Sequence, residues 1–271
     1  MTYRPDGLSG ESPPRLAVTG LTVAFGGLVA LDDVSFTVHD GETVALIGPN
    51  GAGKTTAFNA VCALVRPRRG TITIAGRPAP SSATGLLGAG VARTLQGLGL
   101  FERMSVLENV IVPLTSLGGR PDDDVAAAHR MLARLGLAGV ARRAAGTLPY
   151  PERKRVALAR ALVTGPSLLL LDEPAGGLGA DDIARLADTV REVSDDGCSV
   201  LLVEHHVDFV MGVADRVVVL DFGRVIAAGT PDEIRGDPAV ERAYLGVTTH
   251  DAVTMHDAVT THDAATEPAH E

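Results

Sequence analysis

Two short segments carry residue types in spacings that could do phosphate chemistry. The first, residues 48–55, has the sequence GPNGAGKT and matches the pattern GxxxxGK[ST] between an apolar strand and a helical pattern. In such a loop, successive backbone N–H groups and the helix N-terminus form a cradle for the β- and γ-phosphates of a nucleotide. Lys54 would neutralise phosphate charge, and the Thr55 hydroxyl would bind Mg²⁺. The segment therefore predicts a magnesium-nucleotide site.

The chain uses lysine very selectively. Of its 24 basic residues only Lys54 and Lys154 are lysine. A slim ammonium group fits a tight phosphate loop, where the wider guanidinium fork of arginine would not. Lys54 therefore has a chemical reason to be lysine, whereas the sequence assigns no role to Lys154.

The second segment is a pair of acids at the end of an apolar run. Residues 168–171 are all leucine, and Asp172 and Glu173 follow them. A buried strand has no structural use for adjacent acids at its carboxyl end, but a nucleotide site at that edge of a parallel sheet does. Asp172 would hold Mg²⁺ through water, and Glu173 would orient the water that attacks the γ-phosphate. A purely structural acid pair is the alternative, and the phosphate loop disfavours it.

Hydrophobic periodicity predicts the elements that must position these residues. Short β-runs at 16–25, 34–40 and 43–48 are followed by a helix after Lys54 and a hairpin at 70–77. The opening of the chain is therefore rich in β-strands.

The second half of the chain has a different pattern. Residues 105–163 are mostly helical, with the clearest amphipathic stretches at 125–137 and 152–163. After them, buried strands at 167–173 and 198–204 flank the helical pattern at 180–193, which is the rhythm of a parallel sheet. The body is predicted to be α/β, with a β-rich edge and a helical insert.

Composition excludes several classes of protein. The hydrophobic fraction of 45% and charged fraction of 21% are those of a soluble globular protein, and no apolar run is long enough for a membrane span. The start of the chain resembles no secretion signal, so we expect a cytoplasmic location and buried, reduced thiols at Cys62 and Cys198. A net charge of -9 argues against nucleic acid as a partner.

The two ends of the chain have the composition of disordered segments. Residues 1–14 are rich in Pro, Gly and Ser. Residues 248–271 repeat the unit THDAVT and are acidic and rich in His. Metal binding by these histidines is one interpretation, but a solvated low-complexity tail fits bare polar hexads better.

Four further segments point to a family. Phe25 lies in LTVAFGGLVAL, Gln96 in GVARTLQGLGLF and His205 at the end of LLVEH, and residues 148–155 are LPYPERKR. In order and spacing, together with the two motifs above, these resemble the ATP-binding cassette ATPases across residues 15–247. Singly, Phe25 fits a core aromatic, Gln96 a surface residue and His205 a strand-end histidine. The joint order favours the family.

The resemblance implies an α/β fold, in which a P-loop NTPase core with a mainly parallel sheet carries an antiparallel β-rich edge subdomain and a helical subdomain insert at about 97–165. It also implies that Phe25 stacks on adenine, that Gln96 senses γ-phosphate and Mg²⁺ and faces the membrane partner, and that His205 contacts the γ-phosphate. The catalytic residues expected on this basis are Glu173, His205 and Gln96, and the metal-binding residues are Thr55, Gln96 and Asp172. The nucleotide-binding residues are Phe25, Gly48, Pro49, Asn50, Gly51, Ala52, Gly53, Lys54, Thr55, Thr56, Tyr150 and Glu152.

Within the family the chain looks like the importers of branched-chain amino acids, amides or urea, on the strength of FGGLVAL, GVARTLQ, VEHH and the closing DPAVERAYLG. That branch implies ATP and Mg²⁺ as cofactors, transmembrane permease subunits, a second cassette ATPase, and a solute-binding protein that acts through the permease. It also implies a peripheral position on the inner face of the plasma membrane.

Other functions stay open at this point. An ATPase of a lipid or lipopolysaccharide exporter is similar enough to compete, and so is a regulatory subunit with weak turnover. A soluble cassette ATPase of DNA repair or translation would carry paired cassettes or long coiled-coil insertions, which this chain lacks. A P-loop kinase or GTPase is further away, because no guanine-reading NKxD-type stretch is present.

The signature segment departs from the family pattern. Families of this kind have LSGGQ or LPYGQ, and here Pro151 replaces the second glycine. Proline has no N–H, so one hydrogen bond to an anion is lost, which is typically worth about 1.5–3 kcal/mol. Our hypothesis is a heterodimer with unequal ATP sites, with a homodimer as the alternative. His206, where the branch commonly has Asp, and residues 177–182 are smaller departures.

Overall fold

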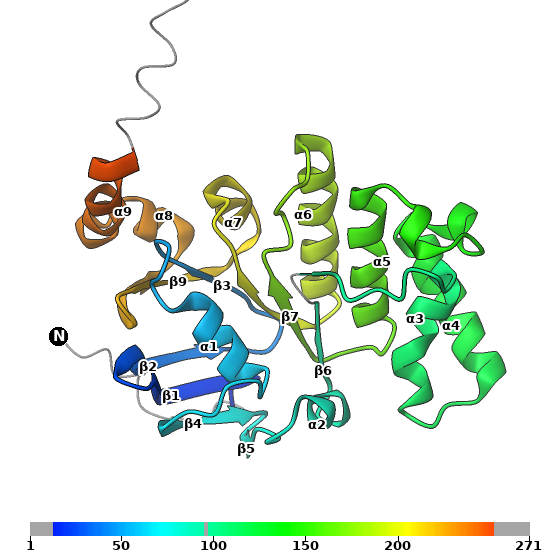
Figure 1. Ribbon diagram of the computed structural model, residues 1–271, viewed down its shortest axis with the longest axis horizontal. Coiled ribbons are helices and arrows are strands. Elements are labelled where there is room, and N and C mark those ends of the chain that lie inside the picture. The colour runs from blue at the N-terminus through cyan, green and yellow to red at the C-terminus, as the bar shows by residue number, and fades with distance from the viewer. Residues whose placement is uncertain (1–12, 95–96, 252–271) are drawn as a thin grey trace, which may run out of the picture.

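The computed structural model of the chain describes residues 13–94 and 97–251. Two β-sheets form the body, and helices cover them and extend to one side (Figure 1). Gln96 and most of the predicted tail lie outside the described residues.

The first sheet is antiparallel and contains the predicted opening strands. Its order is β2-β1-β4-β5, with β1 at Leu16–Phe25, β2 at Leu28–Val38, β4 at Arg69–Ile74 and β5 at Arg77–Pro78. Side chains along β1 and β2 largely alternate between buried and more exposed positions, so each strand presents one face to the core. The hairpin expected at residues 70–77 is confirmed by the pairing of β4 with β5.

The second sheet has the order β10-β9-β3-β8-β7-β6. All neighbouring pairs are parallel except β9 with β10. Its strands are β3 (Thr43–Ile47), β6 (Val91–Arg93), β7 (Leu168–Asp172), β8 (Ser199–Val203), β9 (Arg216–Asp221) and β10 (Arg224–Gly229). Every residue of β3 and β8 is buried, which explains their unbroken apolar sequences. The predicted α/β fold with a mainly parallel sheet is confirmed.

Most helices pack around this second sheet. These are α1 (Lys54–Val61), α2 (Ala83–Gly88), α6 (Ala180–Asp195), α7 (Val207–Val213), α8 (Pro231–Arg235) and α9 (Pro238–Asp251). The helix predicted after the phosphate loop begins at Lys54. The last helix runs to Asp251, beyond the boundary at residue 248 where we expected the tail to begin.

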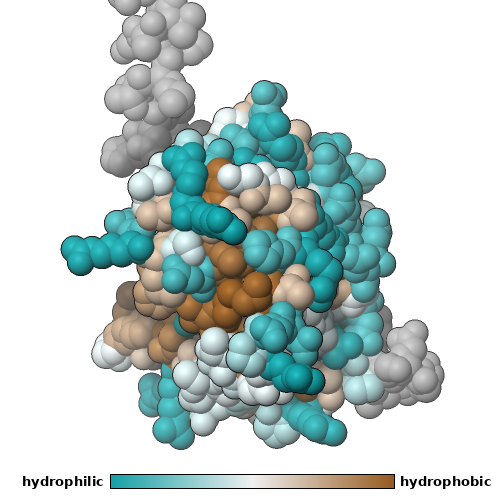
Figure 2. All heavy atoms as spheres, turned by 90° about the vertical axis from the view of Figure 1, so that its right-hand side faces the viewer, coloured by the Kyte–Doolittle hydropathy of each residue, from teal (hydrophilic) through white to brown (hydrophobic). Residues whose placement is uncertain are grey.

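Three other helices gather beyond α6, on the right in Figure 1. They are α3 (Val106–Thr115), α4 (Pro121–Arg134) and α5 (Tyr150–Leu162). Short 3-10 turns at Ala138–Val140 and Ala145–Thr147 lie between α4 and α5. Both predicted amphipathic stretches correspond to helices, α4 and α5. Viewed from this side, the molecule carries hydrophobic residues in the middle of the face and hydrophilic residues around them (Figure 2).

A buried asparagine fixes the start of this helical group. Asn109, in α3, is fully buried. Its Oδ1 accepts from Phe101 N at 2.8 Å, and its Nδ2 donates to Phe101 O at 3.0 Å and Ser105 O at 2.9 Å. Ser105 also caps α3, and the Glu108 side chain completes a capping box with it. These bonds hold the loop that leads from β6 into α3.

Strand β7 belongs to both hydrophobic cores. Leu169 and Leu171 pack with the helical side of the molecule, whereas Leu168 and Leu170 pack with α1 and the antiparallel sheet. Cys62 and Cys198 are buried free thiols, as expected. Within the described ranges, none of the helices is both long and apolar enough to cross a membrane.

We expect Leu170→Ala to lower the free energy of unfolding by roughly 2–5 kcal/mol, because it leaves a cavity where a fully buried side chain joins two layers. Leu117→Ala, at a position that is 48% exposed, is the matched control and should change it by less than about 0.5 kcal/mol. Chemical denaturation measures both variants. Equal losses would contradict the assignment of β7 to the core.

Candidate phosphate-binding site

The register of the parallel sheet brings the predicted motifs to one edge. Leu46 of β3 pairs with Val203, the last residue of β8, and Val203 pairs with Asp172, the last residue of β7. The three strands are neighbours, so their carboxyl ends lie side by side. The glycine loop, the two acids and His205 follow directly from these three ends.

Two glycines of the loop have no room for a side chain. At Gly48, φ is +147°, and a Cβ would collide with the carbonyl oxygen of Leu220. At Gly53, φ is +101°, and a Cβ would lie 2.8 Å from the Ala30 oxygen. The loop is also held from outside, because Gly223 N donates to Ala52 O at 3.0 Å. Backbone therefore packs against backbone on the inner side of this loop, and only glycine permits that approach.

Lys54 lies against the same loop. Its Nζ donates to Gly48 O at 2.7 Å and to Pro49 O at 2.9 Å, and the residue is 9% exposed. Burial lowers the pKa of Lys54, and the negative charge of Glu173 offsets part of that effect. A buried cation beside a glycine-rich loop at a helix N-terminus is the arrangement that an anionic phosphate would complete.

The acids at the end of β7 form a compact negative group with Glu204. Burial raises the pKa of Asp172, and the charges of Glu173 and Glu204 raise it further. A divalent cation would relieve this repulsion. Carboxylate and hydroxyl oxygens suit Mg²⁺, and Asp172 and the exposed Thr55 supply them. These residues fit the metal, while Gln96, the third predicted ligand, lies outside the described residues.

Glu173 has an unusual backbone conformation. Its φ is +46°, a left-handed value that is strained for a residue with a side chain. Its N–H donates to Val203 O at 2.9 Å, while Lys154 Nζ donates to the carbonyl oxygens of Glu173 at 3.1 Å and Pro174 at 2.7 Å. The conformation is therefore held by β8 on one side and by α5 on the other.

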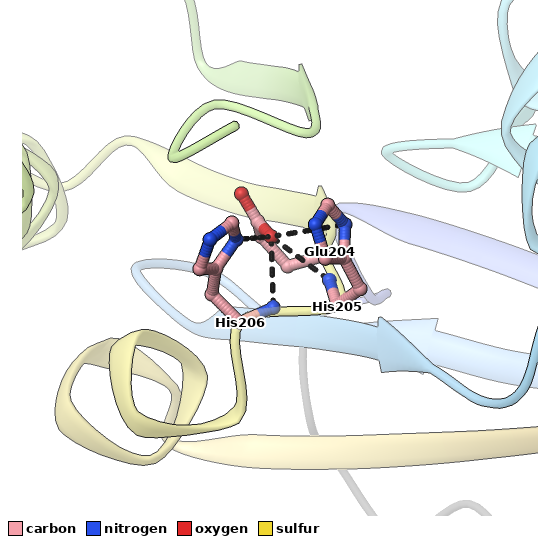
Figure 3. Close-up of side chains that lie close together, drawn as sticks. All are labelled: Glu204, His205 and His206. Carbon is pink, nitrogen blue, oxygen red and sulfur yellow. Dashed lines mark hydrogen bonds and ion pairs between the residues drawn. The ribbon is translucent and has the colours of Figure 1, made fainter. Parts of the chain in front are cut away.

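His205 lies close to Glu173 and to Glu204, and Figure 3 shows its position beside Glu204. Its Nδ1 is 3.9 Å from Glu173 Oε1 and 3.8 Å from Glu204 Oε2. The His205 side chain is 52% exposed, so it can reach a ligand from solvent. The structure thus brings the side chains of His205 and Glu173 close together.

Four other predicted residues come from β1, α1 and α5. Phe25 ends β1 and is 52% exposed. Thr56 is partly exposed in α1. Tyr150 and Glu152 are at the N-terminus of α5, which is well separated from α1 in Figure 1. The segment 148–155 therefore lies away from the phosphate loop of the same chain.

Three residues near the site were given no role by the sequence. Lys154 could have been suspected from the scarcity of lysine, and Glu204 from its position as an acid ending an apolar strand. Tyr244, in α9, makes a backbone hydrogen bond with Gly48; burial raises the pKa of Tyr244, and this bond offsets part of the rise. No local pattern could have placed that residue beside the loop.

A cavity of about 300 Å³ adjoins the acids. Asp172 and Glu173 line one end, and α5 and α6 contribute Pro151, Lys154 and Leu186 to its walls. The space therefore separates the helical group from the strand ends.

Comparison with known proteins gives the family. Residues 31–176 match the model of the family described as ABC transporter, and residues 224–249 match the one described as branched-chain amino acid ATP-binding cassette transporter.

Curated relatives and solved structures agree with these matches. The chain is 40% identical over 256 residues to the high-affinity branched-chain amino acid transport ATP-binding protein LivG of Salmonella typhimurium, covering 87% of this chain and 99% of that protein. It is 36% identical over 221 residues to the lipopolysaccharide export system ATP-binding protein LptB of Acidithiobacillus ferridurans, covering 80% and 91%.

Among solved structures, a nucleotide-free ATP-binding cassette from an ABC transporter superposes with a TM-score of 0.77 and 28% identity, covering 86% of this chain and 99% of that one. The ADP conformation of such a cassette has the same TM-score and identity. Sequence, fold and the converging strand ends lead to one conclusion: the chain belongs to the ABC transporter family, as one of its ATP-hydrolysing subunits.

Proposed function

We propose that this chain drives the import of branched-chain amino acids or related amides by binding and hydrolysing ATP. The observation that carries the proposal is the meeting of the glycine loop, Asp172–Glu173 and His205 at three neighbouring strand ends. The likeness to LivG over 87% of the chain supports the class of cargo. The match at residues 224–249 supports it independently, because it lies outside the nucleotide motifs.

The residues divide the work as follows. The loop amides and Lys54 would hold the β- and γ-phosphates, and Phe25 would stack on the adenine. Thr55 and Asp172, with Gln96, would hold Mg²⁺, which neutralises charge on the transferred phosphoryl group. Glu173 would orient and polarise a water for attack on the γ-phosphorus, so that ADP and phosphate leave. His205 would contact the γ-phosphate.

The separation of α5 from α1 supports a site shared between two cassettes. Tyr150 and Glu152 would contact the nucleotide on a second subunit, while that subunit's signature completes the site on this chain. Pro151 is the second residue of α5. A backbone N–H at this position has no partner within the helix, so it would be free to donate to an anion, and proline lacks that N–H. A heterodimer with one altered site accounts for this, and a homodimer would place the alteration in both sites.

A groove beside the predicted Gln96 segment fits a membrane partner. Its volume is about 290 Å³, and Leu86, Leu87, Phe101, Val112 and Pro113 supply its apolar walls. Arg160 of α5 fixes the neighbouring loop by donating to Leu98 O at 2.7 Å and Gly99 O at 2.6 Å. We assign this groove to a cytoplasmic segment of the permease, which would hold the chain on the inner face of the plasma membrane. The solute-binding protein would then act through the permease.

Two alternatives have specific support. The 36% identity to LptB keeps an exporter possible, although the match at residues 224–249 favours the importers. Pro151 favours a subunit with weak turnover, while the intact Glu173 and His205 favour an active one. Measuring which small solute, delivered by its binding protein, raises ATP hydrolysis by the reconstituted complex decides between import and export.

Glu173→Gln should lower kcat for ATP hydrolysis by about 100-fold or more, because the amide cannot polarise the attacking water. Affinity for Mg²⁺-ATP should stay within about 2-fold, since the phosphate loop is unchanged. Phosphate release and nucleotide titration measure the two quantities. Glu241→Gln, at an exposed position in α9, is the control. Wild-type turnover in Glu173→Gln would refute its role.

Pro151→Gly should raise ATP turnover of the assembled complex roughly 10-fold, because it restores one N–H donor to the phosphate. Pro121→Gly is matched to it, since Pro121 also opens a helix, α4, but lies outside the signature. Unchanged turnover and transport in Pro151→Gly would eliminate the hypothesis of unequal sites.

Val112→Glu should weaken binding of the permease by about 10-fold or more, because it buries a charge in an apolar groove. The ATP affinity of the isolated chain should not change. Val125→Glu, on α4 and outside the groove, should bind the permease normally. Co-purification of the permease with each variant is the measurement. Normal recovery of the permease with Val112→Glu would place the interface elsewhere.

A further inference from the structure

The strongest unassigned feature is the fully buried carboxylate of Glu204, between β8 and His205. The residue is 0% exposed, and it directly follows the last residue of β8. An ionised carboxylate in such a place is costly unless donors surround it. The donors that surround it define what this side chain does.

Both oxygens of Glu204 accept hydrogen bonds, and they do so from two different loops. Oε1 accepts from Ala175 N at 2.6 Å, in the loop that follows Glu173 and Pro174. Oε2 accepts from His205 N at 2.8 Å and from His206 N at 3.1 Å. Figure 3 shows the carboxylate between the two histidines. The Glu204 side chain therefore connects the loop that follows Glu173 to the backbone of His205 and His206.

Helix α5 also contacts the loop that follows β7. Lys154 of α5 donates to the carbonyl oxygens of Glu173 and Pro174, the residues just before Ala175. The attraction of Glu204 and Glu173 raises the pKa of Lys154, against the larger lowering caused by burial. Residues 173–175 are thus held at their carbonyls by α5 and at Ala175 N by Glu204.

We infer that Glu204 is a positioning residue for ATP hydrolysis. It holds the segments of Glu173 and His205 at a fixed distance, so that Glu173 can orient the attacking water while His205 contacts the γ-phosphate. The inference rests on the proposed roles of Glu173 and His205, and it adds a fully buried residue that acts through them. The strained φ of Glu173 explains why a positioning residue is needed. A left-handed residue with a side chain keeps its conformation only when its surroundings hold it.

The same three residues could be taken for a metal site, since ligand atoms of Glu204, His205 and His206 lie within 4.8 Å of one another. The hydrogen bonds disfavour this. His206 Nδ1 is 3.2 Å from Glu204 Oε2, an oxygen that already accepts from two backbone N–H groups. Few lone pairs remain for an ion.

The decisive variant is Glu204→Gln in the complex that co-purifies with this chain. The amide nitrogen of the new glutamine is a donor and would face a backbone N–H. The hydrogen bond to one of the two loops would therefore be lost. We expect kcat to fall about 10-fold or more while KM for ATP stays within about 2-fold. Trapping by Mg²⁺, ADP and orthovanadate, which mimic the transition state, should fall by a similar factor. A role in folding alone would not produce this split.

Two further variants serve as a control and as a substitute for Glu204→Gln. Asp215→Asn is the matched control, because Asp215 Oδ2 also accepts from a backbone N–H, that of Thr43 at 2.8 Å, but at the opposite end of β3. It should leave kcat within about 2-fold of wild type. If Glu204→Gln fails to fold, Glu204→Asp keeps the charge with a shorter reach and should show the same split between kcat and KM.

Three results would contradict the inference or its basis. Wild-type kcat and vanadate trapping in folded Glu204→Gln or Glu204→Asp would overturn it. So would inhibition by Zn²⁺ that disappears in Glu204→Gln at unchanged basal turnover, because that result assigns a metal site. Absence of ATP hydrolysis in the wild-type complex would instead refute the proposed function.

Discussion

The parallel register of β3, β8 and β7 is the constraint on which the rest of the structure depends. A parallel sheet aligns the carboxyl ends of its strands, and here the pairing of Leu46 with Val203 and of Val203 with Asp172 sets those ends level. A shift of one residue in β7 would move Asp172 and Glu173 away from the loop. Apolar burial alone does not set this register, because residues 168–171 are all leucine and alternate ones are buried in each of the two cores.

Charge is concentrated at this edge and is balanced mainly by hydrogen bonds. Burial raises the pKa of Asp172, and the charges of Glu173 and Glu204 raise it further. The two lysines of the chain lie beside them, and each directs its ammonium group to a pair of backbone carbonyls. Lysine suits this task better than arginine because its three donors radiate from one point. The two lysines of the chain thus occupy positions with the same geometric demand.

Much of this architecture could be predicted from the sequence, and the reason is local. The phosphate loop, the leucine strand with its terminal acids and the amphipathic stretches of α4 and α5 each encode their structure within about a dozen residues. The fold class and the family followed from their order. The site residues at the strand ends were brought together as expected, whereas the placing of Gln96 stays a prediction.

What the sequence could not supply are contacts between distant segments. The roles of Lys154 and Glu204 depend on α5 and β8 approaching the same three residues, which no periodicity encodes. The helix α9 is a further example, because no helix was predicted at Pro238–Asp251.

Tyr244 carries one of these distant contacts, and it changes where the working unit of the chain ends. By motif, everything needed for chemistry lies between Phe25 and His205. By packing, the hydrogen bond between Tyr244 and Gly48 makes α9 a neighbour of the first glycine of the loop. A shortened chain that keeps every motif but stops before α9 would therefore lack part of the wall behind its own phosphate cradle. Domain boundaries for expression are better drawn after Asp251 than after the last recognisable motif.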